Sequence, residues 1–130
     1  MKRWENGVTA AQAEQMLARL RKLQMAVPDI EASAVVSMDG LIMASALPRG
    51  VEPDRVSAMS APLLSLGERI LWEFRLGTLD QIIVRGEEGF VVLISIGGEA
   101  VLTALARKEA RLGMILLAMR RAAAELRGVL

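Results

Sequence analysis

The amino-acid sequence predicts a single α+β domain in which helices cover both faces of a five-stranded antiparallel sheet. Apolar residues recur at helical spacing in three segments, one at each end of the chain and one in its middle. Five shorter apolar runs lie between these segments, and their short connections favour antiparallel pairing. The chain has 130 residues and no internal repeat, which is the length of one domain. The predicted order is α-β-β-α-β-β-β-α.

The first predicted helix begins at Thr9. Thr9 and Gln12 form a capping-box pattern, in which each side chain accepts a hydrogen bond from a backbone N–H at the helix start. Pro28 ends the helix, because the residue before a proline avoids helical backbone angles. Residues 1–8 are expected to form a flexible tail and residues 9–130 the single domain. The apolar stripe of this helix comprises Ala13, Met16, Leu17, Leu20, Leu23 and Val27.

A β-hairpin is predicted after the first helix. Its strands are two apolar runs, Ala32–Met38 and Leu41–Leu47, which are separated by Asp39 and Gly40. Asp-Gly favours a two-residue type I′ turn, in which both turn residues have positive φ. We therefore expect a tight hairpin at these two residues.

The middle helix is predicted from Glu52–Asp54 to Leu76. Proline in the first turn and acidic residues near the positive end of the helix dipole are typical of a helix start. Gly77 is placed to supply a left-handed C-terminal cap. Pro62 lies inside the segment and removes one backbone hydrogen bond. We therefore expect either a kink near Ala58–Pro62 or a later start.

Three strands and a final helix complete the chain. The strands are predicted over Leu79–Arg85, Phe90–Ile96 and Ala100–Arg107. Their connections contain glycine and lead from strand to strand, so they are interpreted as hairpin turns and not as phosphate-binding loops. The last helix is predicted over Ala110–Arg127.

The middle helix carries apolar or small residues on two faces. One stripe is predicted to face the sheet: Val56, Met59, Leu63, Leu66, Ile70 and Phe74. The opposite side holds a second set: Ala58, Ala61, Ser65, Glu68, Arg69, Trp72 and Leu76. Small residues leave room for another helix, and Trp and Arg dominate many interfaces. We therefore expect this side to contact another chain; the alternative is that Trp72 covers loops of its own domain.

The composition excludes most catalytic chemistry. The chain has no Cys and no His, so it lacks the usual zinc ligand sets and any Ser-His or Cys-His pair. No nucleotide-binding glycine motif is present. Two pairs of acidic residues, Asp29 with Glu31 and Glu87 with Glu88, have no visible partner in the sequence that would shift a pKa, so they are interpreted as solvated charges. No catalytic, cofactor-binding or metal-binding residue is predicted, and we expect no enzymatic activity.

The composition predicts a protein partner, and it predicts neither nucleic-acid binding nor a membrane span. The net charge is +1, and the two Trp, two Phe and no Tyr are too few for a base-stacking surface. The uncharged stretches are shorter than the ~20 residues that cross a bilayer, and no signal-peptide pattern is present, so a cytoplasmic location is expected. Apolar residues make up 53% of the chain before glycine is counted. This exceeds the usual value of about 45–50% with glycine included, so some apolar surface is expected to meet another chain.

Charge is distributed unevenly along the sequence. Residues 1–27 carry +3, residues 28–106 carry −6 and residues 107–130 carry +4. If the first and last helices share one face of the sheet, that face is basic. It is interpreted either as ordinary solvated helix surface or as a docking face for an acidic partner or an anionic lipid.

Three segments carry a resemblance to a known family. Val35–Leu41 is similar to its first hairpin, Leu76–Val84 to its passage from the middle helix into the third strand, and Gly113–Ala122 to the start of its last helix. With the order and lengths of the elements, these segments make residues 10–127 resemble the Roadblock/dynein light chain family.

The resemblance implies a profilin-like sandwich with strand order 2-1-5-4-3. The first and last helices then lie on one face of the sheet and the middle helix on the other. Family members commonly dimerise by pairing their third strands, which also brings the two middle helices together. For this chain a homodimer is implied, with these interface residues: Ile82, Ile83, Val84, Ala61 and Ser65. A further partner is expected to dock at Glu68, Arg69 and Trp72.

The resemblance also implies a function. Bacterial and archaeal members often work with small Ras-like GTPases as activators or adaptors, and eukaryotic members serve dynein and lysosomal signalling scaffolds. We therefore expect a non-catalytic dimeric regulator or adaptor of a small Ras-like GTPase. The alternative is a structural adaptor in a larger multi-protein assembly, without an effect on GTP turnover.

Overall fold

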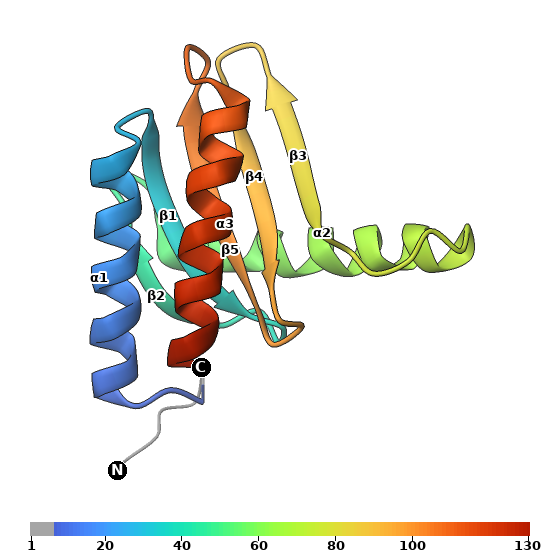
Figure 1. Cartoon of the computed structure of the whole chain (residues 1–130), viewed down its shortest axis with the longest axis horizontal. Coiled ribbons are helices and arrows are strands. Elements are labelled where there is room, and N and C mark those ends of the chain that lie inside the picture. The colour runs from blue at the N-terminus through green and yellow to red at the C-terminus, as the bar shows by residue number, and fades with distance from the viewer. Residues whose placement is uncertain (1–6) are drawn as a thin grey trace.

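Every element predicted from the sequence is present, and the predicted order is confirmed (Figure 1). The computed structural model describes residues 7–130. The elements are α1 (Ala10–Ala26), β1 (Ile30–Ser37), β2 (Ile42–Ala46), α2 (Pro53–Glu73), β3 (Gln81–Gly86), β4 (Gly89–Ile96), β5 (Ala100–Arg107) and α3 (Leu112–Val129).

The five strands form one antiparallel sheet in the order β2-β1-β5-β4-β3, as the resemblance implied. Helices α1 and α3 lie side by side on one face, and α2 crosses the other face (Figure 1). The order leaves β2 and β3 at the two edges of the sheet. Because an edge strand presents unpaired backbone groups, these two edges are where another chain can add to the sheet.

The start of α1 is fixed by the predicted capping box. The Gln12 N–H donates to Thr9 Oγ1 (3.1 Å), and the Thr9 N–H donates to Gln12 Oε1 (2.9 Å). The Gln12 amide also donates to the carbonyl oxygen of Val129 (3.1 Å), which ties the start of α1 to the end of α3. Positions 1–6 of the predicted tail lie outside the described residues. Val8 is only 2% exposed and packs in the core, so the tail does not extend to it.

The turn between β1 and β2 differs from the predicted type I′ turn. The Ser37 N–H donates to the Leu41 carbonyl oxygen (2.8 Å), and the Gly40 N–H donates to the Ser37 carbonyl oxygen (3.0 Å). Gly40 has a φ of 85°, but Asp39 does not have positive φ. The loop therefore has three residues and ends in a left-handed glycine, which is another common hairpin connection. The pairing register also shifts between Val35 and Val36, which pair with Ala44 and Ile42, so β2 carries an extra residue, Met43, next to this three-residue loop.

Helix α2 begins at Pro53, close to the predicted start, and continues through Pro62 to Glu73 as one helix. The alternative of a later start is therefore wrong. Proline lacks an N–H, so the Ala58 carbonyl loses its ordinary partner four residues ahead. Both Ala58 and Pro62 are exposed, which leaves that carbonyl accessible to water.

The C-terminal cap of α2 is built by Arg75, and the predicted cap at Gly77 is wrong. Arg75 has a φ of 54°, the only positive φ of a non-glycine residue among residues 7–130. Its N–H donates to the Trp72 carbonyl oxygen (3.2 Å), and the Leu76 N–H donates to the Leu71 carbonyl oxygen (2.8 Å). These two bonds are those of a Schellman motif, which turns the chain sharply at the end of the helix.

Replacing Arg75 by Gly is expected to raise the free energy of unfolding by about 0.5–1 kcal/mol, because glycine adopts positive φ without the strain of a Cβ atom. Arg75→Ala removes the same exposed side chain but keeps Cβ, so it is the matched control and should stay within about 0.5 kcal/mol of the wild type. Urea unfolding at one protein concentration measures both variants. Equal stability of the two variants would contradict the assigned cap.

Candidate dimer and partner interface

Helix α2 packs on the sheet through a different stripe from the predicted one. Its buried residues are Val56, Ser57, Ser60 and Leu64. Four members of the predicted stripe are instead strongly exposed: Met59 (61%), Leu66 (55%), Ile70 (48%) and Phe74 (72%). Of that stripe only Val56 is buried, so the predicted orientation of the helix is wrong.

Two serines explain the difference. The Ser60 hydroxyl donates to the Val56 carbonyl oxygen (2.7 Å), and the Thr103 hydroxyl of β5 donates to Ser60 Oγ (3.1 Å). Ser57 likewise donates to the Asp54 carbonyl oxygen (3.0 Å). A hydroxyl that bonds to its own helix is satisfied without water, so a serine can face the sheet at little cost. Apolar periodicity does not detect such a stripe.

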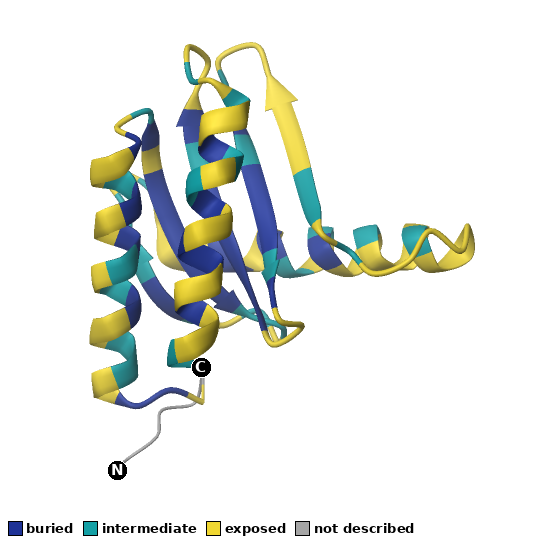
Figure 2. Cartoon of the chain, viewed as in Figure 1, coloured by how far each residue is buried: buried dark blue, intermediate teal, exposed yellow. Residues whose placement is uncertain are grey.

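The C-terminal part of α2 extends past the edge of the sheet (Figures 1 and 2). A Cβ atom on Gly67 would lie 2.9 Å from the Ile82 Cδ1 atom of β3, so the helix crosses the edge strand in close contact at this position. Beyond the crossing, the large apolar side chains are uncovered: Trp72 is 78% exposed, Phe74 72% and Leu76 67%. We call residues 68–76 the α2 overhang.

The edge strand β3 presents free backbone groups next to this overhang. The Ser95 N–H of β4 donates to the Asp80 carbonyl oxygen, and Ile82 and Val84 pair with β4 at alternate positions from there. Inward and outward backbone groups alternate along an antiparallel strand, so the groups of Ile83 point away from β4 at the open edge. The side chains of Ile83 and Val84 are 38% and 47% exposed, on opposite faces of the sheet.

An apolar cavity of about 200 Å³ opens between α2 and the sheet beside this edge. Its lining is apolar apart from the two hydroxyl residues already described: Val56, Met59, Ser60, Leu63, Val84, Val91, Leu93, Thr103 and Leu105. Exposed apolar side chains continue from this cavity along α2, and with the cavity they make up the apolar surface of α2, which four charged residues of the overhang interrupt.

The residues predicted from the sequence to lie in the dimer interface differ in their exposure. Ile82 is half-buried beneath α2, and Ala61 is half-buried beside Gly40 of its own chain, 3.4 Å from where a Cβ on that glycine would lie. Ser65 is exposed on α2. The residues selected for partner docking come together on the exposed overhang: Glu68, Arg69 and Trp72.

Sequence reasoning missed four exposed apolar residues of this surface because it assigned them to the core: Met59, Leu66, Ile70 and Phe74. The signal that could have found them is the surplus of apolar positions on α2. A helix with one face on a sheet needs one apolar stripe, and this helix has more apolar residues than that stripe holds.

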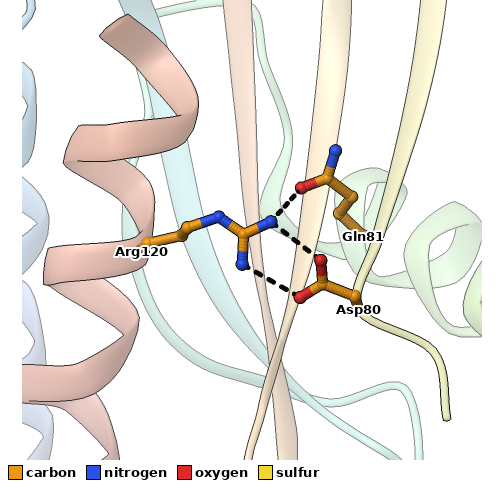
Figure 3. Close-up of polar contacts among 3 residues, drawn as sticks. All are labelled: Asp80, Gln81 and Arg120. Atoms are coloured by element: carbon orange, nitrogen blue, oxygen red, sulfur yellow. Dashed lines mark hydrogen bonds and ion pairs between the residues drawn. The ribbon is translucent and has the colours of Figure 1, made fainter. Parts of the chain in front are cut away.

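A bidentate ion pair joins the residue before β3 to α3 (Figure 3). Arg120 donates to both carboxylate oxygens of Asp80, at 3.0 and 2.7 Å, and to the side-chain oxygen of Gln81. The hydrogen bonds from Arg120 hold the pKa of Asp80 below its ordinary value; burial opposes this effect, and the positive charge of Arg120 lowers the pKa further. The same contact raises the pKa of Arg120. The start of the edge strand is thereby fixed to the helix on the other face.

Neither a metal site nor a membrane span is found in residues 7–130. No group of three or more acidic residues lies close enough to hold a metal ion. No helix of this part of the chain combines the length and the apolar character needed to cross a bilayer.

Comparison with known proteins places the fold and the sequence in one family. The model of the Roadblock/LC7 domain matches residues 16–106. The chain is 36% identical over 100 residues to the uncharacterized protein MJ1340 of Methanocaldococcus jannaschii, covering 77% of this chain and 87% of that protein. The chain belongs to the Roadblock/LC7 family.

Solved structures with the same fold include MglB of Myxococcus xanthus. It has a TM-score of 0.87 at 14% identity and covers 94% of this chain and 92% of that one. A Roadblock/LC7 domain from Streptomyces avermitilis has a TM-score of 0.81 at 22% identity, covering 86% of this chain and 94% of that one. At these identities the likeness shows the fold, which is the profilin-like sandwich of the Roadblock/LC7 family.

Asp80→Asn should cause a small loss of stability at pH 7, because the contact with Arg120 is exposed to solvent and therefore weak. Folding lowers the pKa of Asp80, so the stabilisation is present above the ordinary carboxyl pKa of about 4 and is lost as the pH falls through the lower folded value. The variant and the wild type should therefore converge in acid. Urea unfolding in steps from pH 7 to about pH 2 follows this loss, and Arg120→Gln should give the same pattern. A difference that persists in acid would show that the effect does not come from the charge of Asp80.

Proposed function

We propose that this Roadblock/LC7 domain is a non-catalytic homodimer that binds and regulates a small Ras-like GTPase. The observation that supports the proposal most strongly is the apolar surface of α2, which is continuous with the open edge of β3. An isolated domain with this surface is prone to association, because large apolar patches mark interaction sites. The edge strand supplies a second reason, since pairing it with its symmetry mate removes both open edges in one isologous contact.

Pairing of the two β3 strands also accounts for the α2 overhang. The helix crosses β3 at Gly67, so residues beyond it continue past the edge on the α2 face. If a second copy extends the sheet at β3, its strands lie beneath this overhang. The apolar cavity beside Val84 of each copy is then positioned to receive an apolar side chain from the other. Met59, Leu66 and Ile70 become covered, and each gains on the order of 1 kcal/mol for the half of its surface removed from water.

The dimer joins two α2 helices into one surface on which a GTPase can dock. Trp72, Arg69 and Glu68 offer a large ring beside two opposite charges, the residue types that anchor many interfaces. An activator of this kind supplies no catalytic group. It acts by repositioning groups of the GTPase itself, because positioning and charge stabilisation dominate phosphoryl transfer. The second candidate function is a structural adaptor in a larger assembly, and it is favoured if the GTPase binds without a change in turnover.

Ile83→Pro is expected to yield a folded monomer. Proline removes the Ile83 N–H, which faces the open edge, and leaves the hydrogen bonds between β3 and β4 in place. Multi-angle light scattering should shift from about twice 14.1 kDa for the wild type to about 14.1 kDa for the variant. Circular dichroism should show the same secondary structure in both.

Val84→Pro is the matched control for this experiment. Its N–H pairs with β4, so the same substitution one residue along should damage the sheet and cost about 3 kcal/mol or more in stability. A wild-type chain that is monomeric at micromolar concentration, or an Ile83→Pro variant that remains dimeric, would rule out the proposed strand pairing.

Trp72→Ala is expected to weaken binding of a purified small Ras-like GTPase by about 2 kcal/mol, or roughly thirtyfold, because a truncated interface Trp commonly costs that much. The chain fold should be unchanged, since the ring is 78% exposed. Calorimetric titration measures the affinity, and phosphate release measures GTP turnover. Titration of the chain with GTP and magnesium alone serves as the control and should show no saturable heat. If Trp72→Ala instead unfolds the chain, the ring is part of the core and the docking surface is wrong.

A further inference from the structure

A second surface lies on the face of the sheet opposite α2, and the proposed function does not use it. A groove of about 200 Å³ runs between α1 and α3, which are neighbours on that face. Half of its lining is small or apolar: Leu23, Ala26, Ala118 and Ala122. The other half is charged: Arg19, Lys22, Arg121 and Glu125. Alanines in the lining let another helix approach closely, and the charges around them select what that helix carries.

The groove keeps a net positive charge after its internal ion pairs are counted. The Glu125 carboxylate lies 3.2 Å from Arg19 Nε and 3.0 Å from Lys22 Nζ, so one acid is shared by two bases. No carboxylate of the described residues forms an ion pair with Arg121. Helices α1 and α3 together contain six basic and two acidic residues, whereas residues 28–106 carry −6. The positive charge is therefore a property of this face and not of the whole chain.

Exposed apolar side chains continue the groove along both helices. Met114 is 56% exposed and Leu117 is 54% exposed, and both lie on the same side of α3 as Arg121, at spacings of seven and four residues. Met25 is 81% exposed and follows Lys22 by three residues on α1. Flexible methionines beside a small-residue groove are suited to the apolar face of a bound helix. The bases on either side are suited to its acidic flanks.

We propose that the groove between α1 and α3 binds an acidic amphipathic helix of a partner protein. Five of the six bases on the two helices are arginines, whose planar guanidinium groups match carboxylates in geometry as well as charge. A membrane surface is the less suitable occupant, because neither helix contains an aromatic residue of the kind that anchors interfacial helices in a bilayer. This surface is separate from the β3 edge, so the chain can bind such a helix and dimerise at the same time.

Charge reversal in the groove tests the proposal with a matched control. Lys22→Glu with Arg121→Glu reverses two groove charges, and Arg49→Glu with Arg55→Glu makes the same change in net charge at exposed positions outside the groove. The probe is a synthetic 18-residue helix with leucines on one face and glutamates on its flanks. A second peptide carries glutamine in place of every glutamate. Fluorescence anisotropy measures binding at low and high salt, and amide chemical shifts of the labelled full chain locate it.

The glutamate peptide should bind the wild type and the control variant equally, and at least tenfold more weakly to the groove variant. The glutamine peptide should bind the wild type and the control variant at least tenfold more weakly than the glutamate peptide does, and added salt should weaken binding of the glutamate peptide to these two chains. Shifts should be confined to α1 and α3. The proposal is overturned if the glutamate peptide does not bind, if both peptides bind equally, or if the shifts lie on α2 and β3.

Vesicles distinguish the membrane alternative. Vesicles of phosphatidylcholine with about 30% phosphatidylserine should bind the wild type no better than pure phosphatidylcholine vesicles do. Selective binding to the anionic vesicles, lost in the groove variant, would overturn the proposal in favour of a lipid surface. Light scattering of the groove variant should still give the dimer mass. If the peptide does not bind, the groove proposal fails but the proposed dimer does not, because peptide binding tests the face with α1 and α3 and light scattering tests the pairing at β3.

Discussion

The close crossing of α2 over the edge strand determines which part of this helix lies on its own sheet and which part extends past it. Gly67 allows the helix to approach Ile82 of β3, and a larger residue there would have to displace that side chain. The crossing divides α2 into a first part that covers its own sheet and an overhang that extends past the sheet (Figure 2). The apolar surface, the open edge and the exposed tryptophan all lie beside this crossing. The face that the molecule offers to other chains therefore follows from one helix–strand contact.

The kind and order of the elements could be predicted from the sequence because they depend on local signals. The capping box at Thr9 and Gln12, the apolar periods and the short turns act within a few residues of one another. The left-handed cap could not be predicted, because Arg75 adopts positive φ only where the surrounding hydrogen bonds impose it. The turn at Gly40 is accompanied by an extra residue, Met43, in β2, which no local pattern of Asp39 and Gly40 reveals.

The sequence predicted only part of the candidate interface, because the rest depends on contacts between distant segments. The sequence identified Trp72 and the residues beside it, since a large ring among small residues is unusual on a surface helix. It placed Met59, Leu66 and Ile70 in the core, because an apolar period does not show whether a stripe faces its own sheet or another chain. The buried stripe of α2 is marked instead by Ser60, whose hydroxyl is satisfied by the Val56 carbonyl and by Thr103 of β5. That arrangement is visible only in three dimensions.

The helices on the two faces of the sheet differ in how much apolar surface they bury against their own chain. Helices α1 and α3 bury a large apolar cluster against the sheet, whereas α2, with 21 residues, contributes only Val56 and Leu64 to its cluster of buried apolar residues. A helix held by so few buried apolar side chains has little of its apolar surface removed from water within one chain. A partner that covers Met59, Leu66 and Ile70 would then stabilise the helix as well as form an interface. The weak internal packing of α2 and its surplus of exposed apolar residues are what the proposed dimer would explain together, because in that dimer the order of this helix would be coupled to association.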